Sequence, residues 1–194
     1  MKKSGIIILL AVLAVLFFWG MGAYNGFVKK DEAVKTKWGN VQNEYQRRFD
    51  LIDNLVETVK GYAEHESSTL EAVVNARSKA TQMSVNAENL TPESLQEFQA
   101  TQGELTNALG RLLLLREAYP DLKANQNFLK LQDQLEGTEN RIKEARRQFN
   151  ETAQEYNSSV RQAPGNIIAG LFGFKQKPYF ESEQGAEKAP EVKF

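Results

Sequence analysis

The chain has 194 residues, a net charge of −1 and no cysteine. The near-neutral charge excludes a global electrostatic attraction to nucleic acid or to anionic lipid. The lack of cysteine excludes disulfide bonds, thiolate metal sites, thiol catalysis and lipid attachment through cysteine. Only five prolines occur, and alanine, leucine, glutamate and glutamine are plentiful, a composition typical of long helices.

The N-terminal segment is the most distinctive part of the chain, because Gly5 to Ala23 contains no charged residue. At about 1.5 Å per residue this run makes roughly 28 Å of helix, close to the hydrocarbon thickness of a bilayer. Lysines flank the run on both sides, and Trp19 lies near its far end, where aromatic rings favour the interface. We therefore predict a transmembrane anchor over residues 1–27. Its expected lipid-facing side chains include Ile6, Leu10, Leu13, Phe17 and Trp19.

This segment has two other interpretations. A cleaved signal peptide would use the small residues of Gly20-Met21-Gly22, but the apolar run is longer than the usual ~7–15 residues. A buried core helix would need apolar surroundings that the rest of the chain does not offer. For orientation, Lys2 and Lys3 compete with Lys29 and Lys30 after the run. We expect a single pass through the cytoplasmic (inner) membrane, with the following domain on the outer, periplasmic side.

Apolar residues recur every three or four positions from Val34 to Ala80, a spacing that predicts helix rather than strand. Asp53 or Asn54 could cap a new helix, so the sequence leaves a bend near 50–54 open. The beginning of this stretch is either a stalk or, if the bend exists, a separate helix.

A second helix is predicted to begin at Thr91-Pro92, a cap followed by proline at the first helical position, and to end before Pro120. Asp121 or Asn125 can cap the helix that follows, in which a third apolar stripe runs from Phe128 to Ala163. Short connections make successive helices antiparallel neighbours. The predicted fold is all-α: an N-terminal transmembrane helix followed by an antiparallel up-and-down bundle of three or four long helices, which spans residues 28–163.

After Ala163-Pro164-Gly165 the chain becomes apolar over residues 164–180, too short a segment to span a membrane, and ends in a tail, 181–194, expected to be flexible. Three interpretations of the apolar segment remain open. It caps the open end of the bundle, it lies in the membrane interface, or it contacts another subunit or partner. The candidate interaction residues are Ile167, Ile168, Leu171, Phe172, Phe174, Tyr179 and Phe180.

The sequence contains no persuasive catalytic or metal-binding motif. His65 lies between two glutamates, and adjacent residues of a helix point about 100° apart, so this triplet cannot chelate one ion from a helix. Asp50 and Asp53 lie one turn apart, but a solvated face or a helix cap explains them better than an acid–base pair. Several asparagines at core-adjacent positions are expected to fix helix register. They are Asn25, Asn54, Asn140, Asn150 and Asn157.

Segments along nearly the whole chain resemble the LemA family of membrane-anchored bacterial proteins, in the right order. The matching pieces are Tyr24-Asn25, Arg47-Arg48-x-Asp50-Leu51-Ile52-x-Asn54-Leu55-Val56, Val59-Lys60-Gly61-Tyr62-Ala63-x-His65-Glu66, Val73 to Arg77, Glu117 to Ala124, Phe128-x-x-Leu131-Gln132, Thr138-Glu139-Asn140-Arg141-Ile142, Ala145-Arg146-x-x-Phe149-Asn150, Tyr156-Asn157, and Gly173-Phe174 to Tyr179-Phe180. The family commonly has proline at the position of Asp53. The resemblance implies a single anchor and a helical-bundle domain, and it implies no particular activity.

We expect a membrane-anchored scaffold of a bacterial envelope that binds proteins, including itself, and is not an enzyme. The expected partners are the lipid bilayer and either further copies of this chain or other membrane proteins, with no nucleic acid, small-molecule substrate or cofactor. The alternatives are an accessory enzyme that uses Asp50, Asp53 or His65, and an envelope-organising protein with a second, C-terminal membrane contact.

Overall fold

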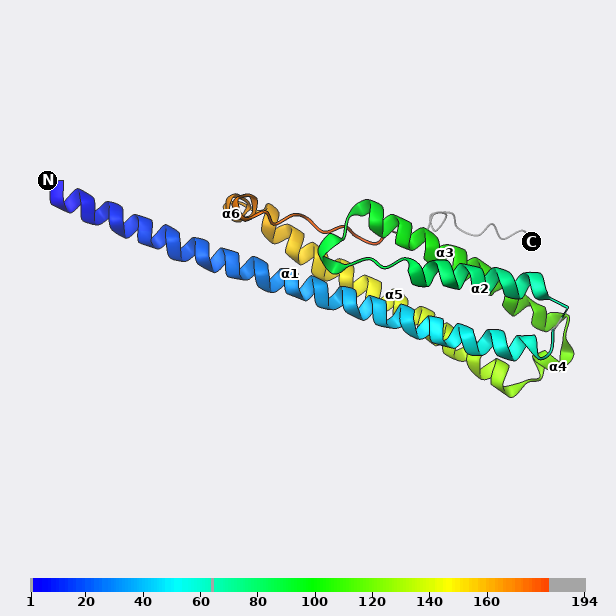
Figure 1. The fold of residues 1–194 in the computed structure, drawn as a ribbon. Coiled ribbons are helices and arrows are strands. Elements are labelled where there is room, and N and C mark those ends of the chain that lie inside the picture. The colour runs from blue at the N-terminus through cyan, green and yellow to red at the C-terminus, as the bar shows by residue number, and fades with distance from the viewer. Residues whose placement is uncertain (1, 64, 182–194) are drawn as a thin grey trace, which may run out of the picture.

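The structure is a computed structural model that describes residues 2–63 and 65–181, and within these ranges its regular elements are all helices. The four long helices are α1 (Lys2–Lys60), α2 (Ser67–Gln82), α3 (Pro92–Leu114) and α5 (Gln126–Arg161). Shorter helices are η1 (Ala87–Asn89), η2 (Leu115–Glu117), α4 (Pro120–Lys123) and α6 (Gly165–Phe172). Figure 1 shows the long helices side by side, each reversing direction, with the first half of α1 extending beyond them. This confirms the predicted fold class.

α1 is one continuous helix of 59 residues, so the bend considered near Asp53 does not occur. The helix ends at Lys60, and the amides of Tyr62 and Ala63 both bond the Val59 carbonyl at 3.0 and 2.9 Å as the chain turns. The stripe from Val34 to Ala80 is therefore two helices, α1 and α2. Gly61 lowers the helix propensity at this point. Because the chain reverses here, the apolar stripes of α1 and α2 can face the same core.

The start signals predicted for the later helices are confirmed. Thr91 and Ser94 form a reciprocal capping box at the start of α3, with N···O distances of 3.1 and 3.0 Å. Asn125 caps α5 by accepting from the Phe128 amide at 2.9 Å. α3 ends at Leu114, before Pro120, and η2 and α4 make the connection to α5.

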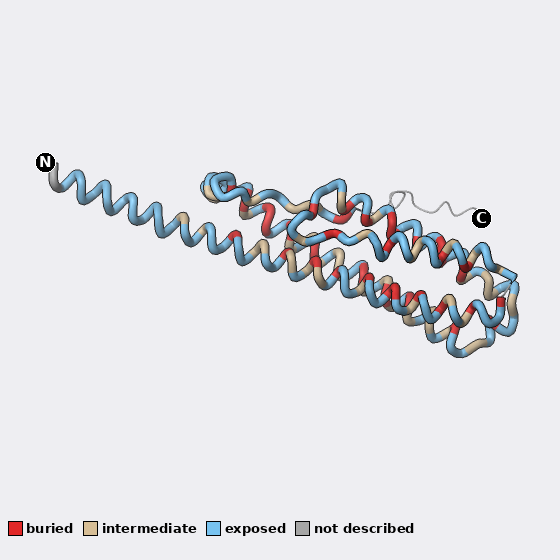
Figure 2. Tube along the Cα trace, in the orientation of Figure 1, coloured by how far each residue is buried: buried red, intermediate tan, exposed pale blue. Residues whose placement is uncertain are grey.

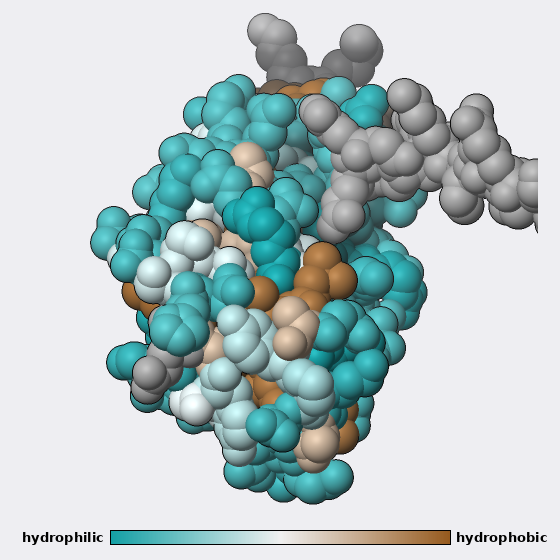
Figure 3. All heavy atoms as spheres, turned by 90° about the vertical axis from the view of Figure 1, so that its right-hand side faces the viewer, coloured by the Kyte–Doolittle hydropathy of each residue, from teal (hydrophilic) through white to brown (hydrophobic). Residues whose placement is uncertain are grey.

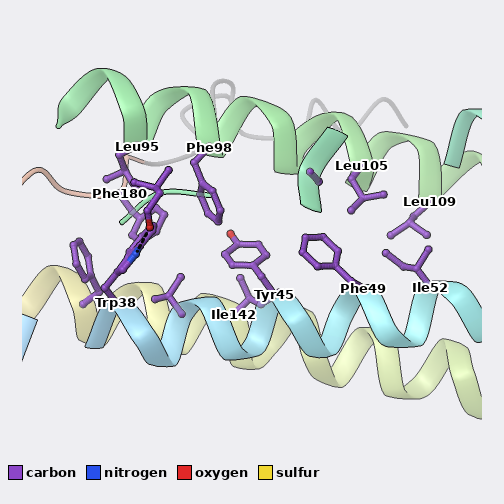
Figure 4. Packing of buried hydrophobic residues seen from close by; sticks show 14 of the residues in the cluster. Trp38, Tyr45, Phe49, Ile52, Leu95, Phe98, Leu105, Leu109, Ile142 and Phe180 are labelled. Atoms are coloured by element: carbon purple, nitrogen blue, oxygen red, sulfur yellow. Dashed lines mark hydrogen bonds between the residues drawn. The ribbon is translucent and has the colours of Figure 1, made fainter. Parts of the chain in front are cut away.

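The core of the bundle lies between α1, α2, α3 and α5, and Figure 4 shows the part between α1, α3 and α5. Trp38 is 1% exposed and donates its indole N–H to the Val85 carbonyl at 2.9 Å, so its one polar atom is satisfied. Its ring packs edge-on against Phe98 and Phe149, with centroids 5.5 and 5.6 Å apart. The second half of α1 is thus a core helix rather than a stalk.

The chain beyond α6 returns along the bundle in residues 174–181, which have no regular secondary structure and which we name the C-terminal strap. Phe180 stacks on Trp38 with a centroid distance of 5.9 Å, and it is 6% exposed. The strap therefore completes the core at the N-terminal end of α3 (Figure 4). The predicted tail lies outside the described residues from 182 onward.

Candidate functional site

The first half of α1 projects from the bundle and exposes its apolar side chains (Figure 2). The predicted anchor residues are all exposed: Ile6 57%, Leu10 59%, Leu13 52%, Phe17 66% and Trp19 40%. The helix is long and apolar enough to cross a bilayer, and none of its most apolar window is buried against the rest of the described protein. Because exposing so many large apolar side chains to water is costly, this surface indicates a lipid environment.

α6 begins directly after Ala163-Pro164, where proline ends α5, and it ends at Gly173. Gly173 has φ 75°, a left-handed conformation that a side chain would strain, and the next amide, of Phe174, bonds the Ala169 carbonyl at 2.9 Å. This closure turns the chain back toward the bundle. In Figure 1 α6 is seen nearly end-on while α1 runs across the view, so α6 lies across α1 rather than along it.

The two faces of α6 differ. Ala169 is 2% exposed and faces the protein, whereas Ile167, Leu171 and Phe172 are 69%, 75% and 57% exposed. Three large apolar side chains are thus exposed together on one short helix. One face of the segment therefore packs on the bundle, as the first interpretation expects, and contact of the other face with a membrane or a partner stays a prediction.

α6 meets α1 at the end of the predicted span. A Cβ placed on Gly20 would lie 3.5 Å from Ile168 Cδ1, which is ordinary contact distance. Between the two helices is a groove of about 340 Å³ whose lining is almost wholly apolar. It is lined by Leu16, Phe17, Gly20, Met21, Tyr24, Ile168 and Phe172. Because one wall of this groove belongs to the span, α6 lies at the depth of the last turns of the span.

An aromatic cluster holds this junction together. Tyr24 contacts Phe172 and Phe174 at centroid distances of 4.9 and 5.5 Å, and Phe27 contacts Phe174 at 5.4 Å. A Cβ on Gly165 would lie only 3.1 Å from the Phe27 ring, so glycine permits this close approach. The edge-to-face arrangement is the favoured one for such rings.

Two asparagines of α5 hold the strap through paired hydrogen bonds to its backbone. Asn157 donates to the Lys177 carbonyl and accepts from the Lys177 amide, both at 2.8 Å. Asn150 does the same with Phe180, at 2.9 and 2.8 Å. These asparagines were expected to fix the register between helices, and they instead fix the position of the strap. The side chain of Asn54, another member of that set, donates to the Asp50 carbonyl of its own helix, at 3.2 Å.

An ion pair ties the strap to α1 just outside the span. Asp31 lies 2.8 Å from Lys177 and 3.2 Å from Lys35. Burial by itself would raise the pKa of Asp31, but the hydrogen bonds and charges of Lys177 and Lys35 outweigh it and hold the pKa below its usual value of 3.8. Burial and the nearby Asp31 carboxylate raise the pKa of Tyr156 to about 12.

The other candidate interaction residues differ in how far they are buried in the protein. Ile168 and Phe174 are partly buried against the core, and Tyr179 is 43% exposed and accepts a hydrogen bond from Asn157 at 2.9 Å. Phe180 is buried against Trp38, so it is a core residue and not available to a partner. Sequence reasoning could not separate these residues, because all are apolar or aromatic.

The candidate catalytic residues Asp50, Asp53 and His65 are all exposed at the surface. Asp53 pairs with Arg77 at 2.5 Å on the surface, and Asp50 accepts from Gln46 at 2.9 Å. His65 is exposed in the turn between α1 and α2. Within residues 2–63 and 65–181, no group of three or more His, Cys, Asp or Glu side chains is placed to hold a metal ion.

The structure thus defines a membrane-associated helical protein, with an N-terminal apolar helix joined to an antiparallel bundle. The model of the LemA family matches residues 37–194, and the chain belongs to this family. It is similar to magnetosome protein MamQ 2 of Paramagnetospirillum magneticum, with 26% identity covering 93% of this chain and 74% of the relative. MamQ of Magnetospirillum gryphiswaldense is 26% identical over 84% of this chain and 66% of its own length. Protein LemA of Metamycoplasma hominis is 23% identical over 92% and 78%.

Proposed function

We propose that this protein is a non-enzymatic, membrane-anchored scaffold of a bacterial envelope, whose bundle is held against the bilayer by both the span and α6. The observation that carries the proposal is the position of Ile167, Leu171 and Phe172, exposed on a helix that packs against Gly20 of the span. A helix that lies across a spanning helix lies in the plane of the membrane. Such helices bury their apolar face about 5–10 Å into the headgroup boundary.

The bilayer explains this surface better than a protein partner does, because the exposed face of α6 continues the exposed face of the span. Lys29 and Lys175 are both exposed near the junction, where ammonium groups can reach lipid phosphates. The opposite end of the bundle offers a contrast: Figure 3 shows that the end facing away from α6 is mainly hydrophilic.

In this proposal the polar surface of the bundle serves as the platform on which other proteins, including further copies of this chain, assemble. The likeness to magnetosome proteins supports a role at a membrane surface rather than in bulk solution. The positions of Asp53 in a surface ion pair and of His65 in an exposed turn support a role without catalysis.

The membrane contact of α6 is tested with an environment-sensitive fluorophore on single cysteines, which the cysteine-free chain makes straightforward. The test pair is Leu171→Cys on α6 and Leu114→Cys at the far end of α3, since these leucines are 75% and 69% exposed. The full-length protein is reconstituted in phosphatidylcholine vesicles with and without lipid-attached quenchers. We expect a blue-shifted, lipid-quenched signal at position 171 and a water-like signal at 114.

The outcomes separate the bilayer from other occupants of the α6 surface. A water-like signal at position 171 contradicts the proposed contact. A blue-shifted signal that lipid quenchers leave unchanged, and that rises with protein density, shows instead that α6 joins copies of the chain. A reporter that is active on only one side of the membrane, fused after Phe194, tests the proposed location of the bundle outside the cytoplasmic membrane.

The absence of catalysis is tested by replacing Asp50, Asp53 and His65 together with asparagine, asparagine and glutamine. In a deletion strain with a measurable envelope defect, we expect the triple variant to restore the wild-type phenotype fully. Loss of restoration with normal protein abundance would support the accessory enzyme instead.

A further inference from the structure

A cavity of about 320 Å³ that opens to solvent lies between α1, α3 and α5, away from the span and α6, and its lining is about as polar as it is apolar. Tyr45 and Arg48 of α1 lie on one side of it, and residues 96–106 of α3 and 139–146 of α5 contribute the others. Glu181 at the end of the strap also lines it. Its volume lies within the range usual for small-molecule sites.

Arg48 is the unusual residue of this cavity, because its charged side chain is only 2% exposed. One terminal nitrogen, Nη1, donates to Glu139 Oε1 at 3.0 Å and to Thr106 Oγ1 at 3.2 Å, and Nη2 donates to Gln102 Oε1. The Arg48 guanidinium also lies over the Tyr45 ring, 5.0 Å from its centroid. The orientation of Arg48 is thus set from three helices, as a binding group needs.

Two donor atoms on side chains that line this cavity are buried without an acceptor. They are Nε of Arg48 and Nε2 of Gln102, and no group among residues 2–63 and 65–181 accepts from either. Gln102 is only 4% exposed. A buried donor without a partner is unfavourable, and more so on a charged group, so two of them on hydrogen-bonded side chains require an explanation.

The chemistry of the lining indicates what would satisfy these donors. Both atoms are N–H donors, so the complementary group presents acceptor oxygens. Arg48, Lys143 and Arg146 line the cavity against two carboxylates, Glu139 and Glu181, and Glu139 is already bonded to Arg48. The net charge of the cavity lining is therefore positive, which favours an anion over a neutral acceptor.

We propose that this cavity binds a small oxyanion, a carboxylate or phosphate compound, through the Nε–H of Arg48 and the side-chain amide of Gln102. Arg146 is held at the rim of the cavity by its hydrogen bond to the Glu181 carbonyl, at 3.1 Å, and lies over the Phe180 ring at 4.7 Å. The strap thus belongs to the site, and the ligand links the position of the strap to the core of the bundle.

The test measures thermal unfolding of the full-length protein in dodecyl maltoside, a detergent without phosphate. Inorganic phosphate and citrate are titrated separately, with sodium chloride at matched ionic strength as the reference. We expect at least one of the two to raise the midpoint saturably, because a ligand that binds only the folded state stabilises it. The anion that does so identifies the class of the natural ligand as phosphate, carboxylate or both.

Three variants test whether the stabilising anion binds in this cavity. A Cβ on Gly103, which lines the cavity, would meet no atom within 4 Å, so the added side chain of Gly103→Leu has room to enter the cavity. Gly110 is one heptad later on α3 and equally uncrowded, so Gly110→Leu gains the same helix propensity outside the cavity. Gln102→Glu is isosteric, pairs with Arg48 and repels an anion. We expect Gly103→Leu and Gln102→Glu to weaken binding at least about tenfold, and Gly110→Leu to retain it.

The proposal fails if neither anion raises the midpoint beyond sodium chloride, which would mean that water alone satisfies the two donors. It also fails if the rise is linear in concentration or persists in Gly103→Leu and Gln102→Glu, because a general salt effect does not depend on this cavity. Since Gln102→Glu keeps the volume of the side chain, it remains informative if Gly103→Leu does not fold.

Discussion

The two halves of α1 belong to one continuous helix, yet apolar side chains are exposed in the first half and buried in the second. In the first half Leu13 and Phe17 are more than half exposed, whereas in the second half Val41 and Ile52 are fully buried (Figure 2). The first half is apolar on every side, and the second has one apolar stripe and a polar face. The difference shows that the surroundings of a helix follow from the distribution of its apolar residues and not from helix formation itself.

The largest expected effect is on the first half. Replacing both Leu10 and Leu13 by arginine places two charges near the middle of the span and raises the cost of insertion by about 5–7 kcal/mol. We expect the protein to become extractable from membranes by alkaline carbonate, while the bundle keeps its helical circular dichroism. Leu114→Arg, at an exposed site far from the span, serves as the control and retains membrane association. Retention of the double variant would mean that the first half of α1 is not the anchor.

Substitution of the two tryptophans compares the contributions of the two halves of α1 to the stability of the bundle. Trp38 is 1% exposed and its indole N–H is hydrogen-bonded, so Trp38→Ala should cost about 3–5 kcal/mol of unfolding free energy. Trp19 is 40% exposed, and Trp19→Ala should leave the unfolding of the bundle unchanged within about 0.5 kcal/mol. Denaturant unfolding of the full-length protein in detergent measures both. Equal effects would contradict the assignment of the two halves to two environments.

The ion pair at the boundary between the halves should have a smaller effect that depends on pH. The folded-state pKa of Asp31 is held below 3.8, so its contribution is present above that value and is lost as the pH falls through the lower, folded-state pKa. We expect Asp31→Asn to cost about 1 kcal/mol at neutral pH. The difference from the wild type should shrink toward zero in acid. A difference that is independent of pH would show that the carboxylate charge is not what holds Lys177.

The smallest effect is expected on the polar face of the second half. Asp53 pairs with Arg77 at 2.5 Å but is 57% exposed, so Asp53→Ala should cost no more than about 0.5 kcal/mol. Its neighbour Ile52 is fully buried, and Ile52→Ala should cost about 2–5 kcal/mol. Chemical denaturation compares the two. A large effect at Asp53 would give its ion pair a structural importance that its exposure does not suggest.

Much of the architecture could be predicted because it depends on local signals. The uninterrupted apolar run predicted the span, Thr91-Pro92 predicted the start of α3, and Asn125 was a predicted cap of α5. The end of α1 at Lys60 was missed, since the apolar spacing continues through the turn and only packing favours reversal there. The site at α6 was predicted as a segment, but its division into buried Phe180 and exposed Leu171 was not.

The sequence alone determined that this chain has an apolar N-terminal helix followed by long amphipathic ones, because composition and periodicity act over a few turns of a helix. The tertiary structure decided which distant residues meet: Gly20 with Ile168, Asn157 with Lys177, and Arg48 with Gln102 and Glu139. These contacts join positions from 20 to 148 residues apart along the chain. No local pattern encodes them, since each depends on how the faces of several helices come together in one core.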